Sequence, residues 1–129
     1  MLAIDTNIVV RYLTGDDKRM SPAALKLVGE NSVFVSVTVL LEAEWVLRNA
    51  YEMPRERVIG ELRKFFGLET VTVAEAEKVA KALAYAERGL DLADALHLVQ
   101  SEGCEAFVTF DKKFARRARS FDGVAIRLA

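Results

Sequence analysis

In Leu2-Ala3-Ile4-Asp5-Thr6-Asn7 a short apolar run ends at a carboxylate and passes directly into a helical pattern, which is typical of an α/β fold. The run Leu2–Ile4 has the length and character of a buried strand, and a helix is predicted over Asn7–Leu13. Because they lack polar alternation, this run and those that follow predict strands covered on both faces. The other runs are Val33–Val35, Thr70–Val73, Ala106–Phe110 and Val124–Ile126.

Helical patterns lie between these runs. Ser21 followed by Pro22 predicts the start of a helix that ends at about Gly29. Proline or glycine residues close most of the later patterns. The later helices are predicted over Thr38–Tyr51, Arg55–Phe66, Ala74–Arg88, Asp91–Glu102 and Asp111–Ser120. This alternation predicts an α/β fold with a parallel sheet and right-handed crossovers.

The composition is that of one globular domain spanning residues 1–129. No apolar stretch is long enough to cross a membrane, and the N-terminal segment lacks the basic residues of a secretory signal. Cys104 is the only cysteine and cannot form an internal disulfide, so a cytoplasmic location is expected. The net charge of −1 does not exclude a nuclease, since an acidic site and a basic rim can cancel in the sum.

Asp5 and Asp111 each follow a predicted strand directly. Both therefore fall at the carboxyl ends of parallel strands, which is where open α/β sheets bind ligands. Either residue alone could be a helix N-cap, a role that aspartate fills well. Two of them, with further acids within reach, favour a functional site.

The helix Thr38–Tyr51 contributes a third acid. Glu44 lies nearly opposite the apolar stripe of this helix and four residues before Arg48, which predicts an ion pair on the solvent face. Glu42 flanks the stripe near Trp45, so its carboxylate is expected to be partly buried and to need a partner. Interaction with the helix terminus is the alternative explanation for its placement.

The helix Asp91–Glu102 contributes the fourth. Asp94 lies between two alanines, which leave its carboxylate in a crevice, whereas Asp91 suits the role of a helix cap. His97, the only histidine, could act as a general base but is more often a packed or capping group in such a position.

The predicted site thus consists of four carboxylates, with neither a cysteine cluster nor a histidine pair. Oxygen ligands of this kind indicate Mg²⁺ or Mn²⁺. Such ions hold phosphate oxygens and activate water, so the pattern favours phosphodiester hydrolysis. The residues expected to bind the metal and to catalyse are Asp5, Glu42, Asp94 and Asp111.

Four stretches resemble, in family order, the acidic motifs of the PIN domain, and specifically those of VapC-type toxins from prokaryotic toxin–antitoxin pairs. They are Leu2–Asn7, Ser36–Leu47, Asp91–Leu98 and Val108–Phe114. The same four carboxylates occupy the acidic positions of these motifs. The resemblance covers essentially the whole chain, and four motifs together are far more specific than one.

The resemblance implies a three-layer α/β/α sandwich around a five-stranded parallel sheet. It also implies an Mg²⁺- or Mn²⁺-dependent endoribonuclease acting on RNA, a homodimer, and inhibition by a cognate antitoxin. Thr6 and Asn7 are expected to orient the carboxylates, and Thr109 to support Asp111. Asp91 matches a position that is often acidic.

Two surfaces are predicted besides the site. A basic cluster follows Asp111 and could line a path for the RNA backbone or form an ordinary solvated helix face; it consists of Lys112, Lys113, Arg116 and Arg117. Large apolar residues on two helices predict a symmetric dimer surface, with burial in the monomer core as the alternative. They include Trp45, Phe65 and Phe66.

The main alternative is a receiver-like Mg²⁺-binding signalling domain without nuclease activity. Such a domain needs an acidic pair near the first strand and an aspartate after the third. The first strand here offers only Asp5, and Thr70–Val73 leads into Ala74 and Glu75. A phosphatase with an aspartyl nucleophile would need a second aspartate where Asn7 stands.

Overall fold

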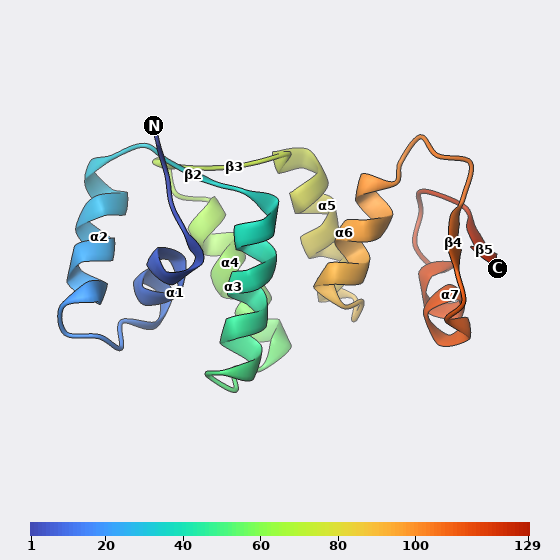
Figure 1. Cartoon of the computed structure of the whole chain (residues 1–129), viewed down its shortest axis with the longest axis horizontal. Helices are drawn as coiled ribbons and strands as arrows, with labels where there is room; N and C mark the ends of the chain where they lie inside the picture. Colours follow the sequence, from blue (N-terminus) through green and yellow to red (C-terminus); the bar gives the residue numbers. More distant parts are fainter. The chain divides into compact units, whose positions relative to one another are not determined.

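The computed structural model describes residues 1–129, with five strands and seven helices (Figure 1). All strand pairings are parallel, so the predicted α/β class is confirmed. The chain divides into two compact units, Met1–Ala76 and Glu77–Ala129, each of which is described by itself. The strands form a three-stranded sheet in the first unit and a two-stranded sheet in the second. That the two units form one domain stays a prediction.

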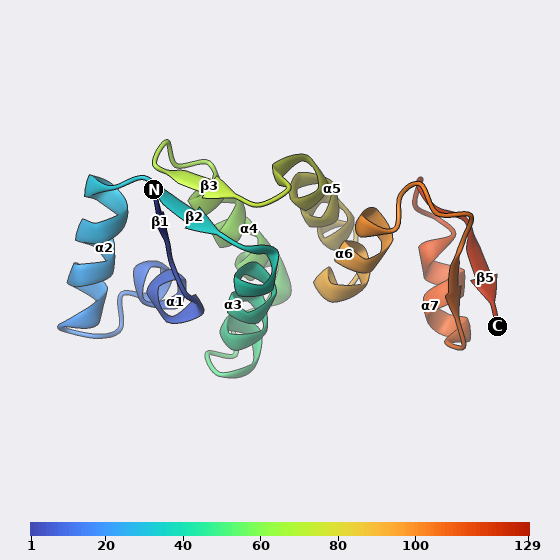
Figure 2. The same ribbon diagram turned by 45° about the horizontal axis from the view of Figure 1, so that its top comes forward.

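The sheet of the first unit consists of β1 (Leu2–Ala3), β2 (Val33–Val35) and β3 (Val71–Val73), in that spatial order (Figure 2). Val33 pairs in register with Leu2 on one side and Val71 on the other. The middle strand is the best covered. β1 lies at the edge of this three-stranded sheet and pairs only with β2.

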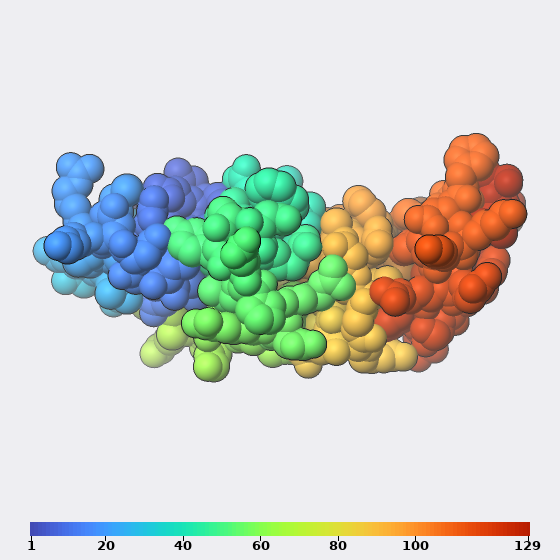
Figure 3. Space-filling model, turned by 90° about the horizontal axis from the view of Figure 1, so that it is seen from below, coloured from blue at the N-terminus to red at the C-terminus, as the bar shows by residue number.

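Four helices complete the first unit. They are α1 (Thr6–Thr14), α2 (Met20–Glu30), α3 (Val37–Asn49) and α4 (Arg55–Phe66). α1 packs against α2 and α3, and α3 packs against α4. In the space-filling view the blue to green side chains of this unit form a continuous packed surface (Figure 3).

The core of the first unit includes large side chains from both α3 and α4. Leu40 and Leu47 of α3 and Leu62 of α4 have no exposed surface. Phe65 is also buried and contacts Tyr12 edge to face. The prediction that Phe65 belongs to a dimer surface is therefore wrong, because its ring fills the monomer core. Trp45, by contrast, is 57% exposed.

The predicted start of the second helix is wrong, because another residue takes the capping role. α2 begins at Met20, and the Asp17 carboxylate accepts hydrogen bonds from the backbone N–H groups of Arg19 and Met20. Ser21 lies inside the helix, buried, where its hydroxyl accepts from the N–H of Asp17.

Glu44 makes the predicted ion pair with Arg48, but it does not face solvent. Its side chain is 1% exposed and Arg48 covers it from one turn further along α3. The prediction assumed that α3 buries only one apolar stripe. The helix in fact packs against both α1 and α4, so more of its surface is buried. Glu44 therefore belongs to the interior of the first unit.

The second unit contains three helices and two strands: α5 (Ala76–Glu87), α6 (Leu92–Gln100), β4 (Phe107–Thr109), α7 (Lys112–Ala118) and β5 (Ile126–Leu128). Only the first residue of α5, Ala76, is counted with the first unit. β4 and β5 pair in parallel, and α7 packs against β5. No helix of the chain has the length and apolar character needed to cross a membrane.

The last strand begins two residues later than predicted. The Tyr85 hydroxyl donates to the backbone carbonyl of Asp122, which holds the preceding turn against α5. Gly123 in this turn adopts a φ of 137°, a conformation that side chains rarely allow. Pairing with β4 starts only after the turn, where the N–H of Phe107 donates to the carbonyl of Ala125.

Candidate metal centre

Asp5 links β1 to α1 and lies at the carboxyl end of its strand, as predicted. Its Oδ1 accepts a hydrogen bond of 3.1 Å from the backbone N–H of Ile8, so Asp5 is also the N-cap of α1. The cap fixes one carboxylate oxygen by a bond to the helix terminus. The second oxygen remains available to a ligand.

Glu42 lies across from Asp5 on α3. The Thr6 hydroxyl donates a hydrogen bond to its Oε1, which is the expected contact of Thr6 with a carboxylate. Glu42 is exposed rather than partly buried, because it faces an open groove and not the packed side of α3. Asn7 lines the same groove, but its amide donates to the sulfur of Met20 at 3.7 Å and to no carboxylate.

The groove that holds Asp5 and Glu42 runs between α1 and α3. Asp5 caps the N-terminus of α1 and Glu42 lies in the middle of α3, whereas Arg11 lies further along α1 and Tyr51 follows the end of α3. Apolar side chains of both helices line the length between: Val10, Val39, Val46 and Ala50.

Arg11 is held at its end of the groove by a polar network. Its Nη1 donates to Asp16 Oδ1 at 2.9 Å and to the Tyr51 hydroxyl at 3.2 Å. The Tyr51 hydroxyl in turn donates to Asp16 Oδ2 at 2.7 Å, and the Thr14 hydroxyl to Oδ1 at 2.7 Å. This network was not predicted from the sequence; the spacing of Arg11 and Thr14 on one face of a helix is the signal that could have pointed to it.

The network shifts the titration of its members. The Tyr51 and Thr14 hydroxyls, followed by the Arg11 guanidinium, stabilise the charged form of Asp16 and hold its pKa well below the usual range. The same carboxylate raises the pKa of Tyr51, with burial adding to the effect. The network therefore favours the charged form of Asp16.

Asp111 links β4 to α7 in the second unit, in the same manner as Asp5 in the first. Its Oδ1 accepts from the backbone N–H of Phe114 at 3.0 Å and caps α7. The Thr109 hydroxyl accepts from the N–H of Asp111 at 3.0 Å, so the expected support by Thr109 is present.

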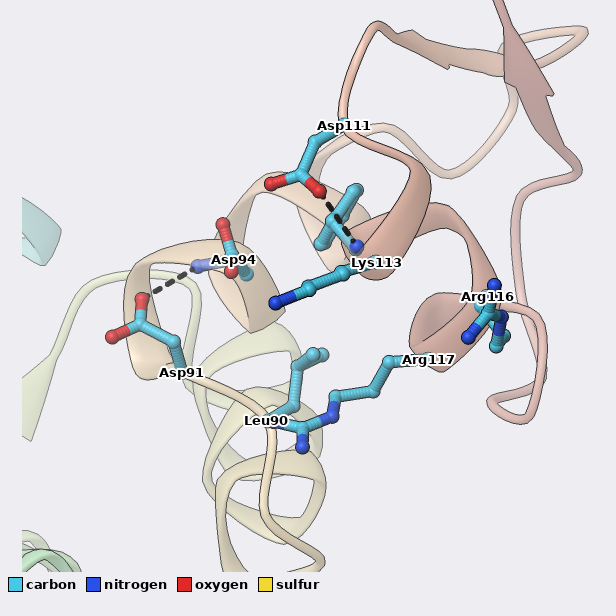
Figure 4. Close-up of a pocket in the computed structure, with 8 residues that line it drawn as sticks. Leu90, Asp91, Asp94, Asp111, Lys113, Arg116 and Arg117 are labelled. Atoms are coloured by element: carbon cyan, nitrogen blue, oxygen red, sulfur yellow. Dashed lines mark hydrogen bonds between the residues drawn. The ribbon is translucent and has the colours of Figure 1, made fainter.

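Asp94 lies in the first turn of α6, and its backbone N–H donates to Asp91 Oδ1 at 3.2 Å. Asp91 is the N-cap of α6, as the simpler interpretation predicted. Figure 4 shows the carboxylates of Asp94 and Asp111 directed toward one space, with the Lys113 side chain extending beside them.

The pocket around Asp94 and Asp111 has an acidic and a basic wall. Lys113, Arg116 and Arg117 of the predicted basic cluster line it, whereas Lys112 does not. Arg117 Nη1 donates to the carbonyl of Gly89 at 3.0 Å, which fixes that guanidinium at the rim (Figure 4).

His97 does not line this pocket. Its exposed ring stacks on Phe107, with 6.4 Å between ring centroids and 19° between ring planes. This contact favours the packing interpretation over a general base.

The structure therefore places the four predicted acids as two pairs, Asp5 with Glu42 in the first unit and Asp94 with Asp111 in the second. It contains no group of three or more histidine, cysteine or acidic side chains arranged to hold a metal. The available donors are carboxylate and hydroxyl oxygens, the ligands that hard divalent cations prefer. Convergence of the four acids stays a prediction.

Comparison with known proteins gives one result. The family model described as PIN domain matches residues 2–120, a segment that contains all four acids. Neither the curated proteins nor the solved structures contain a significant match.

Proposed function

We propose that this chain, which belongs to the PIN-domain family, is an Mg²⁺- or Mn²⁺-dependent endoribonuclease and the toxin of a type II toxin–antitoxin pair. PIN domains are typically metal-dependent nucleases that bind divalent cations and act on nucleic acid. One observation carries the proposal: Asp5 and Asp111 each join a parallel strand to the helix after it, and each shares a pocket with a second acid. The receiver-like alternative has no support at β3, which no aspartate follows.

The donor set fits a hard cation. Asp5 and Asp111 each use one carboxylate oxygen to cap a helix and keep the other for a ligand. Glu42 is oriented by Thr6 through one oxygen and likewise keeps the second. We propose that these three residues, with Asp94, bind the ion together.

A bound divalent ion supplies a Lewis acid for the scissile phosphate and lowers the pKa of a coordinated water. The residues of the chain hold the ligand oxygens in fixed positions. Helix capping holds Asp5 and Asp111, and a side-chain hydrogen bond holds Glu42, so the oxygens need little rearrangement when the substrate binds. Such preorganisation is the contribution that the protein itself makes to a metal-assisted hydrolysis.

The proposal that the substrate is RNA and not DNA rests on the resemblance of the four motifs to those of VapC-type toxins. The same resemblance supports a cognate antitoxin as protein partner. A small DNA-binding protein encoded in the neighbouring reading frame is the expected observation. Co-expression of the two proteins should give a complex without nuclease activity.

The basic wall beside Asp94 and Asp111 supports a path for the RNA backbone. Phosphate contacts by Arg and Lys dominate nucleic-acid affinity and make it depend on salt. Reversal of charge at Arg116 and Arg117 should raise KM and flatten its salt dependence, whereas Arg119→Glu, outside the pocket, should do neither. If reversal left cleavage and its salt dependence unchanged, the RNA would follow another path.

The proposed activity is tested by cleavage of matched RNA and DNA oligonucleotides with Mn²⁺, with Mg²⁺ and with EDTA. RNA should be cut only with metal. Asp5→Asn and Asp94→Asn should each reduce the rate by ~10²-fold or more while the protein stays folded. Asparagine caps a helix as well as aspartate does, so the substitution at Asp5 removes charge and preserves the cap.

A purely structural role predicts the reverse result. In that case the asparagine variants, which keep the helix caps, would retain the wild-type rate of cleavage. Asp94→Asn cutting RNA at the wild-type rate would refute the catalytic assignment.

A further inference from the structure

The groove between α1 and α3 continues well beyond the two acids at its start. Its volume of about 520 Å³ lies within the ~300–1,000 Å³ of small-ligand sites. Arg11 follows Asp5 by six residues, which at 1.5 Å per residue is ~9 Å along α1. The proposed metal chemistry uses only the first part of this space.

Arg11 has donor groups that the protein does not use. Its Nη1 is occupied by Asp16 and Tyr51, whereas its Nε is buried without a hydrogen-bond partner. The hydrogen bonds that Arg11 makes within the protein both use Nη1 and leave Nη2 to a ligand. The unused Nε and Nη2 lie on the same edge of the guanidinium, and this edge forms the planar fork that matches two oxygens of a phosphate.

The network around Arg11 holds this fork in place. Asp16 and Tyr51 together restrain Nη1, and Thr14 restrains Asp16. An arginine whose rotamer is already fixed loses less conformational entropy when it binds an anion. A salt bridge between Arg11 and Asp16 alone would not need the two hydroxyl groups.

We propose that Arg11 binds an RNA phosphate next to the one that is cleaved. The nucleotide between these two phosphates lies in the groove, against the apolar side chains of Val10, Val39 and Val46. This inference rests on the proposed ribonuclease function and assigns a substrate-positioning role to Arg11.

The alternative is that Arg11 only ties the end of α1 to the following loop through Asp16. The two roles differ in what they change. A structural tie contributes to stability and leaves substrate affinity alone. A phosphate contact contributes to affinity and to its dependence on salt, with little effect on kcat.

The test uses the full-length protein with Arg11→Met, Arg11→Lys and the matched control Arg19→Met. Arg19 is exposed at the residue before α2 and lines neither the groove nor the acidic pocket. KM and kcat are measured on an RNA oligonucleotide. Affinity for the same RNA is measured by fluorescence anisotropy in the Asp5→Asn background over a range of salt concentrations.

Arg11→Met should raise KM and Kd about tenfold, the loss of one charged hydrogen-bond pair. It should also reduce the slope of log Kd against log salt by ~0.7, one phosphate contact on a single strand. Arg11→Lys keeps the charge beside Asp16, folds for that reason, and should show an intermediate KM because it lacks the fork.

Equal KM, Kd and salt slope in Arg11→Lys, Arg19→Met and wild type would overturn this inference and leave the ribonuclease proposal standing. Absence of metal-dependent RNA cleavage by the wild type would instead overturn the ribonuclease proposal itself. The two failures are therefore distinguishable.

Discussion

Thr6 on α1 donates its hydroxyl hydrogen to the carboxylate of Glu42 on α3, so a residue beside one predicted metal ligand orients another. Thr6→Val removes the donor with little change in volume. We expect kcat to fall about tenfold, equivalent to ~1.4 kcal/mol, because one metal ligand loses its orientation. Thr6→Ser keeps the hydroxyl and should cleave RNA at nearly the wild-type rate. A folded Thr6→Val variant with wild-type kcat would contradict the role of this hydrogen bond.

Glu42 and Glu44 are two residues apart on α3 and should respond to substitution in opposite ways. Glu42 is exposed in the groove, so Glu42→Gln should abolish cleavage and leave the melting temperature unchanged or higher. Glu44 is buried and paired with Arg48, so Glu44→Gln should lower the free energy of unfolding by ~2 kcal/mol and leave kcat unchanged. The two variants serve as controls for each other in a thermal melt and a cleavage assay. The same response from both would mean that the two glutamates are wrongly assigned.

The network at Asp16 predicts a contribution to stability that depends on pH. Because the folded-state pKa of Asp16 lies below its unfolded value, near ~3.9, folding is favoured at pH values above that point. The contribution disappears as the pH falls through the lower folded-state pKa. Asp16→Asn should therefore lower the melting temperature at neutral pH. Below about pH 4, the melting temperature of this variant should decrease less with falling pH than that of the wild type. Asp122→Asn, in an exposed turn, should follow the wild-type profile.

Trp45 is 57% exposed, and the homodimer that could cover it stays a prediction. Large exposed aromatic groups are common at interfaces between protein chains. Light scattering should give twice the chain mass of 14.4 kDa at high micromolar concentration, and Trp45→Glu should shift the mass toward that of one chain. A wild-type mass of one chain at that concentration would contradict the dimer.

Local signals in the sequence were sufficient for much of the fold. Arg55–Phe66 was predicted with its observed bounds, because Pro54 precedes it and Gly67 follows it. Val33–Val35 was likewise predicted with its observed bounds. Asp5, Asp91 and Asp111 could be recognised as residues that begin helices, since capping depends only on neighbours in the chain.

The features that sequence reasoning missed depend on contacts between distant residues. The hydrogen bond from Tyr85 to Asp122 delays the last strand, and no local pattern reveals it. The burial of Glu44 depends on the several neighbours of α3. Arg11, Asp16 and Tyr51 form one network only because α3 ends beside α1.

The central claim is that the acids of both units bind one divalent ion. It is tested most directly by thermal melts with Mn²⁺ and with EDTA, beside RNA cleavage, for Asp5→Asn, Asp111→Asn and the double variant. A ligand that binds only the folded state raises the melting temperature, so Mn²⁺ should stabilise the wild type. Either single substitution should remove both this stabilisation and cleavage, and the double variant should lose nothing further. If each single variant kept part of the Mn²⁺ effect and only the double variant lost it, the two acidic pairs would be separate sites and the claim would be wrong.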